Sequence, residues 1–133
     1  MNRWQKVLVI DADRNAQAML HGVLSRHIDL TSAHDPMEAL QALKQHTFDA
    51  IIASNMPGLV GIDLLREAKR AHPRMRALLL LDHHNLGAIG QATDDPCVDG
   101  LLVRPISLTD VLLSLRAPSR QRSMNTRRMS LAR

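Results

Sequence analysis

The chain has 133 residues, of which 45% are hydrophobic and 2% aromatic, and it carries 17 basic and 13 acidic residues. This length suits one hydrophobic core that buries about two-thirds of the unfolded surface. The single cysteine, Cys97, excludes an intrachain disulfide, and no apolar stretch approaches the eighteen or so residues that cross a bilayer. We therefore expect one cytoplasmic domain with no contact with the membrane.

Charge is distributed unevenly along the chain. Six arginines lie from position 116 onward with no acidic residue among them, whereas residues 1–115 carry 11 basic and 13 acidic residues. This asymmetry predicts a domain over residues 1–116 and a basic, flexible C-terminal tail over residues 117–133. The composition of the tail does not favour binding of nucleic acid, because the tail lacks aromatic residues and a recognition motif.

The first half of the chain alternates short apolar runs with amphipathic stretches. Residues 7–10 predict a buried strand, and Asp13 then offers a cap for a helix. Residues 28–33 predict a weaker strand, followed by a helix that begins at Asp35 and Pro36. The apolar side chains expected to face the core are Ala16, Met19, Leu20, Val23 and Leu24 in the first helix and Met37, Leu40 and Leu43 in the second.

The second half repeats the alternation. Strands are predicted over residues 50–53, 77–81 and 101–103, and helices over residues 61–71, 86–92 and 108–115. The helix over residues 86–92 should be short or loose because Gly87 and Gly90 each cost it about 1 kcal/mol relative to alanine. Ser107 is the expected cap of the last helix. Strands that alternate with helices indicate a parallel sheet covered on both faces.

Polar residues follow several of these strands. Asp11, Ser54, Asp82 and Arg104 each stand where a predicted strand ends. In open parallel sheets, ligands bind beyond the carboxyl ends of the strands. We therefore expect these four side chains to converge on one edge of the sheet.

Four ordered motifs carry a resemblance to a known family. They are Asp11-Ala12-Asp13 after the first strand, the stretches over residues 33–40 and 56–65, and Val103-Arg104-Pro105-Ile106 near the end of the domain. Together they resemble the response-regulator receiver domain, the CheY-like module of two-component signalling, over roughly residues 5–116. The resemblance implies a flavodoxin-like, doubly wound sheet of five parallel strands in the order 2-1-3-4-5, with a cis bond common at the position of Pro105.

The resemblance also implies a phosphoacceptor aspartate and an acidic pair that holds Mg²⁺, and here this sequence departs from the family. Ala12 replaces the second acid, and the acceptor position falls on Ala53 or on Ser54, depending on which motif is used to count. The remaining replacements are Asp82 for a hydroxyl residue, Leu101 for the aromatic switch residue and Arg104 for lysine. We therefore expect a degenerate pocket with no catalytic residue, no metal site and lost or weak Mg²⁺ binding.

Simpler roles compete for several of these residues. Asp11 suits hydrogen bonds to loop amides, Asp13 suits a helix cap, and the tandem His83-His84 suits a solvated loop better than a metal site. Arg104 is the most informative departure, because a guanidinium group pairs with carboxylates through a rigid fork. An ion pair of Arg104 with Asp82 or Asp11 is therefore expected to fill the pocket.

The functional hypothesis is a pseudo-receiver, not an enzyme, that acts by phosphorylation-independent contact with a protein partner. The family commonly uses the face of the fourth helix, fifth strand and fifth helix for such contacts or for homodimers. Two alternatives stay open. One is phosphotransfer to an unconventional acceptor such as Ser54 or Asp82, and the other is an accessory role on nucleic acid through the arginines of the tail.

Overall fold

The computed structural model describes residues 5–54, 61–82 and 95–116. These residues build one parallel sheet of five strands in the order β2-β1-β3-β4-β5. The strands are β1 Lys6–Ile10, β2 Asp29–Ala33, β3 Ala50–Ser54, β4 Arg76–Leu81 and β5 Gly100–Val103. The predicted doubly wound fold and strand order are confirmed.

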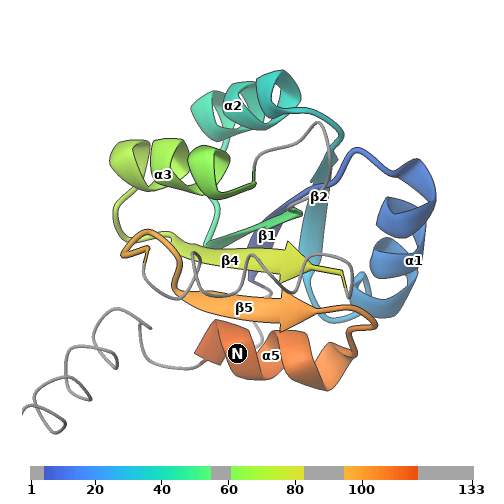
Figure 1. The fold of residues 1–133 in the computed structure, drawn as a ribbon. Coiled ribbons are helices and arrows are strands. Elements are labelled where there is room, and N and C mark those ends of the chain that lie inside the picture. The colour runs from blue at the N-terminus through green and yellow to red at the C-terminus, as the bar shows by residue number, and fades with distance from the viewer. Residues whose placement is uncertain (1–4, 55–60, 83–94, 117–133) are drawn as a thin grey trace, which may run out of the picture.

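Helices cover both faces of this sheet. They are α1 Arg14–Leu24, α2 Pro36–Gln45, α3 Gly61–Ala71 and α5 Leu108–Arg116. In Figure 1, α2 and α3 lie together on one face, whereas α5 lies on the other. The predicted helix over residues 86–92 and the predicted tail lie outside the described residues. Within the described ranges no helix is both long and apolar enough to span a bilayer.

Side-chain caps start three of the helices, as their sequences predict. Asp13 accepts hydrogen bonds from the amides of Asn15 and Ala16, and Asp35 accepts one from the amide of Glu38. Ser107 Oγ accepts from the amide of Asp110, whose carboxylate in turn accepts from the Ser107 amide. These bonds satisfy amide groups that have no partner within the helix.

Alternation along the strands divides the core into two layers. Leu8 and Ile10 of β1 pack in the layer under α2 and α3, whereas Val7 and Val9 pack in the layer with α1 and α5. Successive side chains of a strand point to opposite faces. The same alternation decides on which face of the sheet each polar residue lies at the end of its strand.

The predicted core faces of α1 and α2 were partly wrong. Met19 and Val23 of α1 are 74% and 46% exposed, and Met37 of α2 is 77% exposed. The inward positions of α1 are Gln17, Leu20 and Leu24, so its buried stripe is narrower than the apolar stripe of the sequence. Apolar periodicity gives the approximate direction of a helix face, but the contact with the sheet decides how wide the buried stripe is.

Ion pairs fasten the turn before β5 to α3. Arg66 donates to Asp95 Oδ2 through Nε and Nη2, at 3.1 and 2.8 Å, and Lys69 Nζ lies 2.7 Å from Asp99 Oδ2. The other Asp95 oxygen accepts from the amide of Cys97, and burial together with that carboxylate raises the pKa of the Cys97 thiol. Because both acids are buried, these contacts fix where β5 enters the sheet.

Two helical glycines give a matched test of this packing. A Cβ atom at Gly61 would lie 2.8 Å from Leu79 Cδ1 and 2.9 Å from the carbonyl oxygen of Ser54, whereas one at Gly22 meets nothing within 4 Å. We expect Gly61→Ala to destabilise the fold by about 1–3 kcal/mol through overpacking, and Gly22→Ala to stabilise it by about 0.5–1 kcal/mol. Urea unfolding measures both changes, and equal effects of the same sign would contradict the packing of α3 on β3.

Candidate functional site

Four polar side chains meet at the carboxyl edge of the sheet, on the face covered by α1 and α5. Strand parity places Asp11, Asp82 and Arg104 on this face, because each continues the alternation of β1, β4 or β5. Ser54 continues the alternation of Ala50 and Ile52 in β3, so it lies on the same face. Because Ile10 pairs with Ala53, the next residue of β3, Ser54, stands beside Asp11. Ala53 packs in the opposite layer. The register therefore sets Ser54, and not Ala53, beside Asp11.

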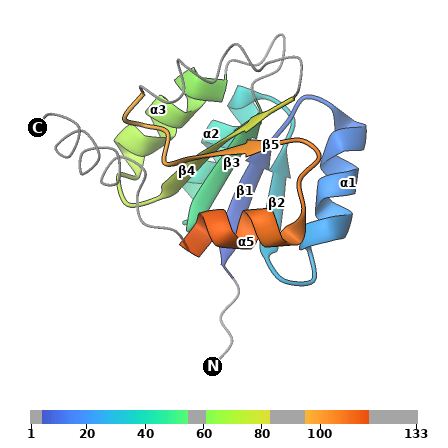
Figure 2. The same ribbon diagram turned by 60° about the horizontal axis from the view of Figure 1, so that its bottom comes forward.

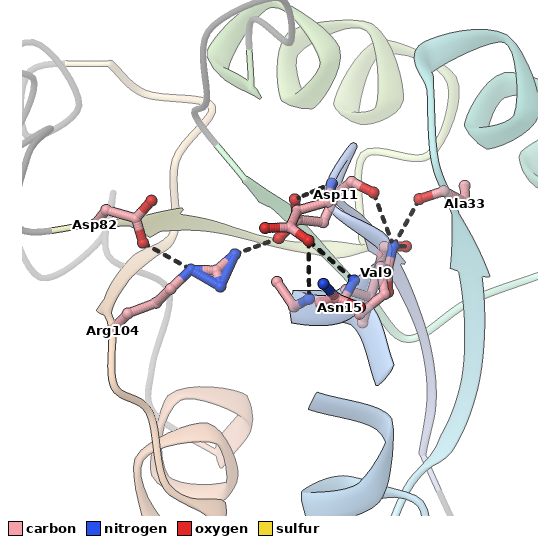
Figure 3. A network of polar contacts seen from close by, with 9 residues as sticks. Val9, Asp11, Asn15, Ala33, Asp82 and Arg104 are labelled. Carbon is pink, nitrogen blue, oxygen red and sulfur yellow. Dashed lines mark hydrogen bonds and ion pairs between the residues drawn. The ribbon is translucent and has the colours of Figure 1, made fainter. Parts of the chain in front are cut away.

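Arg104 bridges two carboxylates across this edge. Its Nη2 donates to Asp11 Oδ2, and its Nε lies 2.8 Å from Asp82 Oδ1. Figure 3 shows the guanidinium group between the two acids, with Asp82 at its outer side and Asp11 at its inner side. The sequence suggested one acid or the other as partner, and the structure places Arg104 against both. We call this arrangement the Arg104 bridge.

Both carboxylate oxygens of Asp11 are engaged. The side chain is only 3% exposed, and while Oδ2 accepts from Arg104, Oδ1 accepts from the amide of Asp13 at 2.9 Å. Asp13 itself points its carboxylate at the first turn of α1, and Ala12 is exposed. One oxygen of this buried carboxylate therefore accepts a charge-assisted hydrogen bond from a guanidinium group, and the other accepts a hydrogen bond from a backbone amide. Asp11 thus accepts the hydrogen bond from a loop amide that the sequence suggested, and it also forms the ion pair with Arg104.

Gln17 was not among the residues predicted for the site, yet its side chain organises the same edge of the sheet. Its side chain is buried, and Nε2 lies 2.7 Å from the carbonyl oxygen of Ala33, 3.1 Å from that of Val9 and 3.4 Å from that of Asp11. The side-chain amide of Gln17 therefore ties α1 to the ends of β1 and β2. A usable signal was present, because Gln17 stands three residues before Leu20 on the inward stripe of α1.

Ser54 and Leu101 complete the positions predicted for the pocket. Ser54 is 1% exposed, and its hydroxyl makes no hydrogen bond with any residue in the described ranges. Leu101, at the expected switch position, is half-buried and packs against the core layer of α2 and α3. The histidines at 83 and 84 lie outside the described residues.

The donor set does not fit a divalent cation. Mg²⁺ requires several oxygen ligands in near-octahedral geometry. At this edge one Asp11 oxygen faces a guanidinium group, the other faces an amide, and Ala12 supplies no oxygen from its side chain. Across residues 5–54, 61–82 and 95–116, no group of three or more His, Cys, Asp or Glu side chains is arranged to hold a metal ion.

The sequence of the chain is similar to those of known proteins. Residues 7–116 match the family model of the response regulator receiver domain. The chain is 28% identical over 108 residues to the DNA-binding transcriptional regulator NtrC of Escherichia coli K12, an alignment that covers 80% of this chain and 23% of that protein. The chain thus spans about a quarter of the length of the curated relatives it matches.

Solved structures agree on the fold. The signal receiver domain of an HD domain-containing protein from Pseudomonas fluorescens Pf-5 superposes with a TM-score of 0.75 at 27% identity, covering 86% of this chain and 93% of that one. A response regulator from Burkholderia pseudomallei, solved with a phosphorylated aspartic acid and a calcium ion, gives 0.74 at 23% identity, covering 96% of this chain and 74% of that one. At 23% identity the second likeness concerns the fold alone.

The Arg104 bridge makes a quantitative prediction. Arg104→Met leaves the buried Asp11 carboxylate without its cation and should destabilise the protein by roughly 3 kcal/mol. Asp82→Asn removes a partner that is 30% exposed and should cost less than about 1 kcal/mol. Combining Arg104→Met with Asp11→Asn should recover much of the loss, because both charges of the inner pair are then removed.

Denaturant unfolding of both double-mutant cycles measures these couplings. The cycle of Arg104 with Asp82 is the control for the cycle with Asp11, since the Asp82 side chain is 30% exposed and the Asp11 side chain only 3%. Strict additivity in the cycle with Asp11 would mean that Arg104 does not stabilise the buried acid.

Proposed function

Because the chain belongs to the response regulator receiver domain family, we propose that it is an atypical receiver of two-component signalling that works without accepting a phosphoryl group. Its mechanism is contact with a protein partner, and Mg²⁺ binding is lost or weak. What carries the proposal is the Arg104 bridge, in which a side chain of the protein itself faces the acids at the end of the sheet.

Electrostatics at the edge support this mechanism. A phosphoryl group on an aspartate brings further negative charge beside acidic side chains, so a divalent cation is needed to balance it. Here Arg104 supplies a fixed positive charge to Asp11 and Asp82, and Ser54 stands where strand register sets a side chain next to Asp11. Arg104 offsets part of the negative charge of these two acids from within the protein, so the pair can hold one arrangement without a phosphoryl group or a metal.

The partner surface that we propose is the face of β5, α5 and the chain between β4 and β5. Its described part contains Leu113 of α5, which is 63% exposed although it is a large apolar residue. The ion pairs of Asp82 with Arg104 and of Asp95 with Arg66 fasten the chain on either side of residues 83–94. Ion pairs that hold Asp82 and Asp95 suit a receiver whose binding face does not change. A homodimer through this face is part of the same proposal.

A binding test separates this function from phosphotransfer. We expect no saturable binding of Mg²⁺ with beryllofluoride in calorimetry at physiological metal concentrations, because Asp11 alone supplies too few hard oxygen ligands. Incubation with acetyl phosphate and Mg²⁺ should leave the intact mass unchanged. A phosphorylated species carrying the group on Ser54 or Asp82 would instead establish the alternative function.

A reconstructed pocket provides the positive control. The triple variant Ala12→Asp, Ser54→Asp, Arg104→Lys restores two acids and a lysine, and we expect it to bind Mg²⁺ and beryllofluoride. Arg104→Lys alone should not, since lysine supplies no metal ligand. If the unaltered protein binds as tightly as the triple variant, the proposed loss of phosphorylation is wrong.

The partner face is tested by charge placed on one apolar residue. Leu113→Glu should weaken capture of the cellular partner by at least about tenfold, because a carboxylate in an apolar contact loses its hydration. Met37→Glu is the matched control, since Met37 is also exposed but lies on α2 on the opposite face. Crosslinking in the cells of origin, followed by quantification of the captured protein, measures both. Equal capture by the two variants would place the contact elsewhere.

A further inference from the structure

An apolar groove lies between α1 and the turn that joins β5 to α5. Its volume is about 480 Å³, within the range of roughly 300–1,000 Å³ typical of ligand sites. Its wall on α1 consists of Ala16, Met19, Leu20 and Val23, and Pro105 and Ile106 form the opposite wall. In Figure 2 the orange turn between β5 and α5 comes close to the blue helix α1.

The groove exposes two apolar side chains that do not belong to the hydrophobic core. Met19 and Val23 were expected in the core from the pattern of α1, yet they are 74% and 46% exposed. Exposed apolar side chains gathered along a groove mark a contact site more often than scattered ones do. The exposure therefore points to an occupant with apolar side chains of its own.

The charge at the mouth of the groove specifies that occupant further. Asp13, Asp82 and Arg104 line the polar end, and Asp11 is paired with Arg104. Arg14 and Asp110 lie in the first turns of the two adjoining helices. These four carboxylates and two guanidinium groups give a formal charge of minus two. An occupant that carries positive charge beside apolar groups matches both features of the groove.

The chain contains such a segment. Residues 117–133 include five arginines, no acidic residue, and the apolar residues Met124, Met129 and Leu131. An extended segment of this length reaches at most about 56 Å. Passing back along α5 and then along the groove wall on α1 takes about 30 Å, given a rise of about 1.5 Å per helical residue. The segment is therefore long enough to return to the groove of its own molecule.

We propose that residues 117–133 bind in this groove within the same molecule, with Met or Leu side chains against Met19 and Val23 and arginines near Asp13 and Asp82. The segment would then act as an intramolecular occupant of the α1 face, which any partner for that face must displace. The proposal does not depend on whether the pocket accepts phosphate. Tethering supplies an effective concentration on the order of 1 mM, so a contact with a dissociation constant of about 0.3 mM would be about three-quarters formed.

Methionine oxidation in the full chain tests the proposal with a built-in control. Met19 and Met37 are almost equally exposed, and Met37 also has acidic neighbours, Asp35 and Glu38, but it lies on α2 away from the groove. With dilute hydrogen peroxide and peptide mass analysis, we expect Met19 to oxidise about fourfold more slowly than Met37, in line with the bound fraction above. Equal rates at the two sites overturn the proposal.

Charge variants of the segment identify the occupant. Replacing Arg120, Arg122, Arg127 and Arg128 by glutamate should equalise the two rates, whereas lysine at the same four positions should preserve the slow oxidation of Met19. Unfolding midpoints of both variants verify that the domain is intact. Protection of Met19 that persists with the four glutamates overturns the proposal. Protection that disappears on dilution also overturns it, because the occupant would then be a second copy of the chain.

Discussion

The buried carboxylate of Asp11 is the constraint on which the edge of this sheet depends. A charged group that is 3% exposed must be paired, because an unpaired buried charge costs several kcal/mol. Here Asp11, at the end of β1, is paired with Arg104, which follows the last strand β5, and with the amide of Asp13. One acid thus joins the end of β1, the start of α1 and the turn after β5.

The Arg104 bridge also connects the ends of two neighbouring strands. Arg104 also contacts Asp82, the residue after β4, so its guanidinium group links the two strands β4 and β5 at the edge where β4 leaves the sheet. On the other side of residues 83–94, Arg66 of α3 holds Asp95. Ion pairs therefore hold Asp82 and Asp95, the described residues that flank residues 83–94.

Two surfaces follow from this architecture, and they have different consequences. The face of β5 and α5 carries an exposed leucine and is the site proposed for a partner protein. The groove on α1 combines apolar walls with a negative mouth, and the basic segment that follows α5 complements it. If that segment covers the groove, the face of β5 and α5 stays available while the α1 face is restricted. Specificity then arises partly from a surface that is blocked.

The sequence by itself determined the architecture of this protein. Apolar runs of four to six residues separated by capped helices leave few arrangements other than a covered parallel sheet, and the caps at Asp13, Asp35 and Ser107 are local features with local causes. It also pointed to Arg104 as a residue that needs an acid, because a guanidinium group near buried strands must be paired.

Only the tertiary structure decided the details that depend on contacts between distant segments. Strand register selected Ser54 over Ala53 as the neighbour of Asp11, since a shift of one residue reverses the face on which every side chain lies. The position of α1 on the sheet turned Gln17 inward and left Met19 outside. Arg104 contacts both acids because the ends of β1, β4 and β5 lie within reach of one side chain. Such distances are set by the packing of the whole domain, and local periodicity carries no information about them.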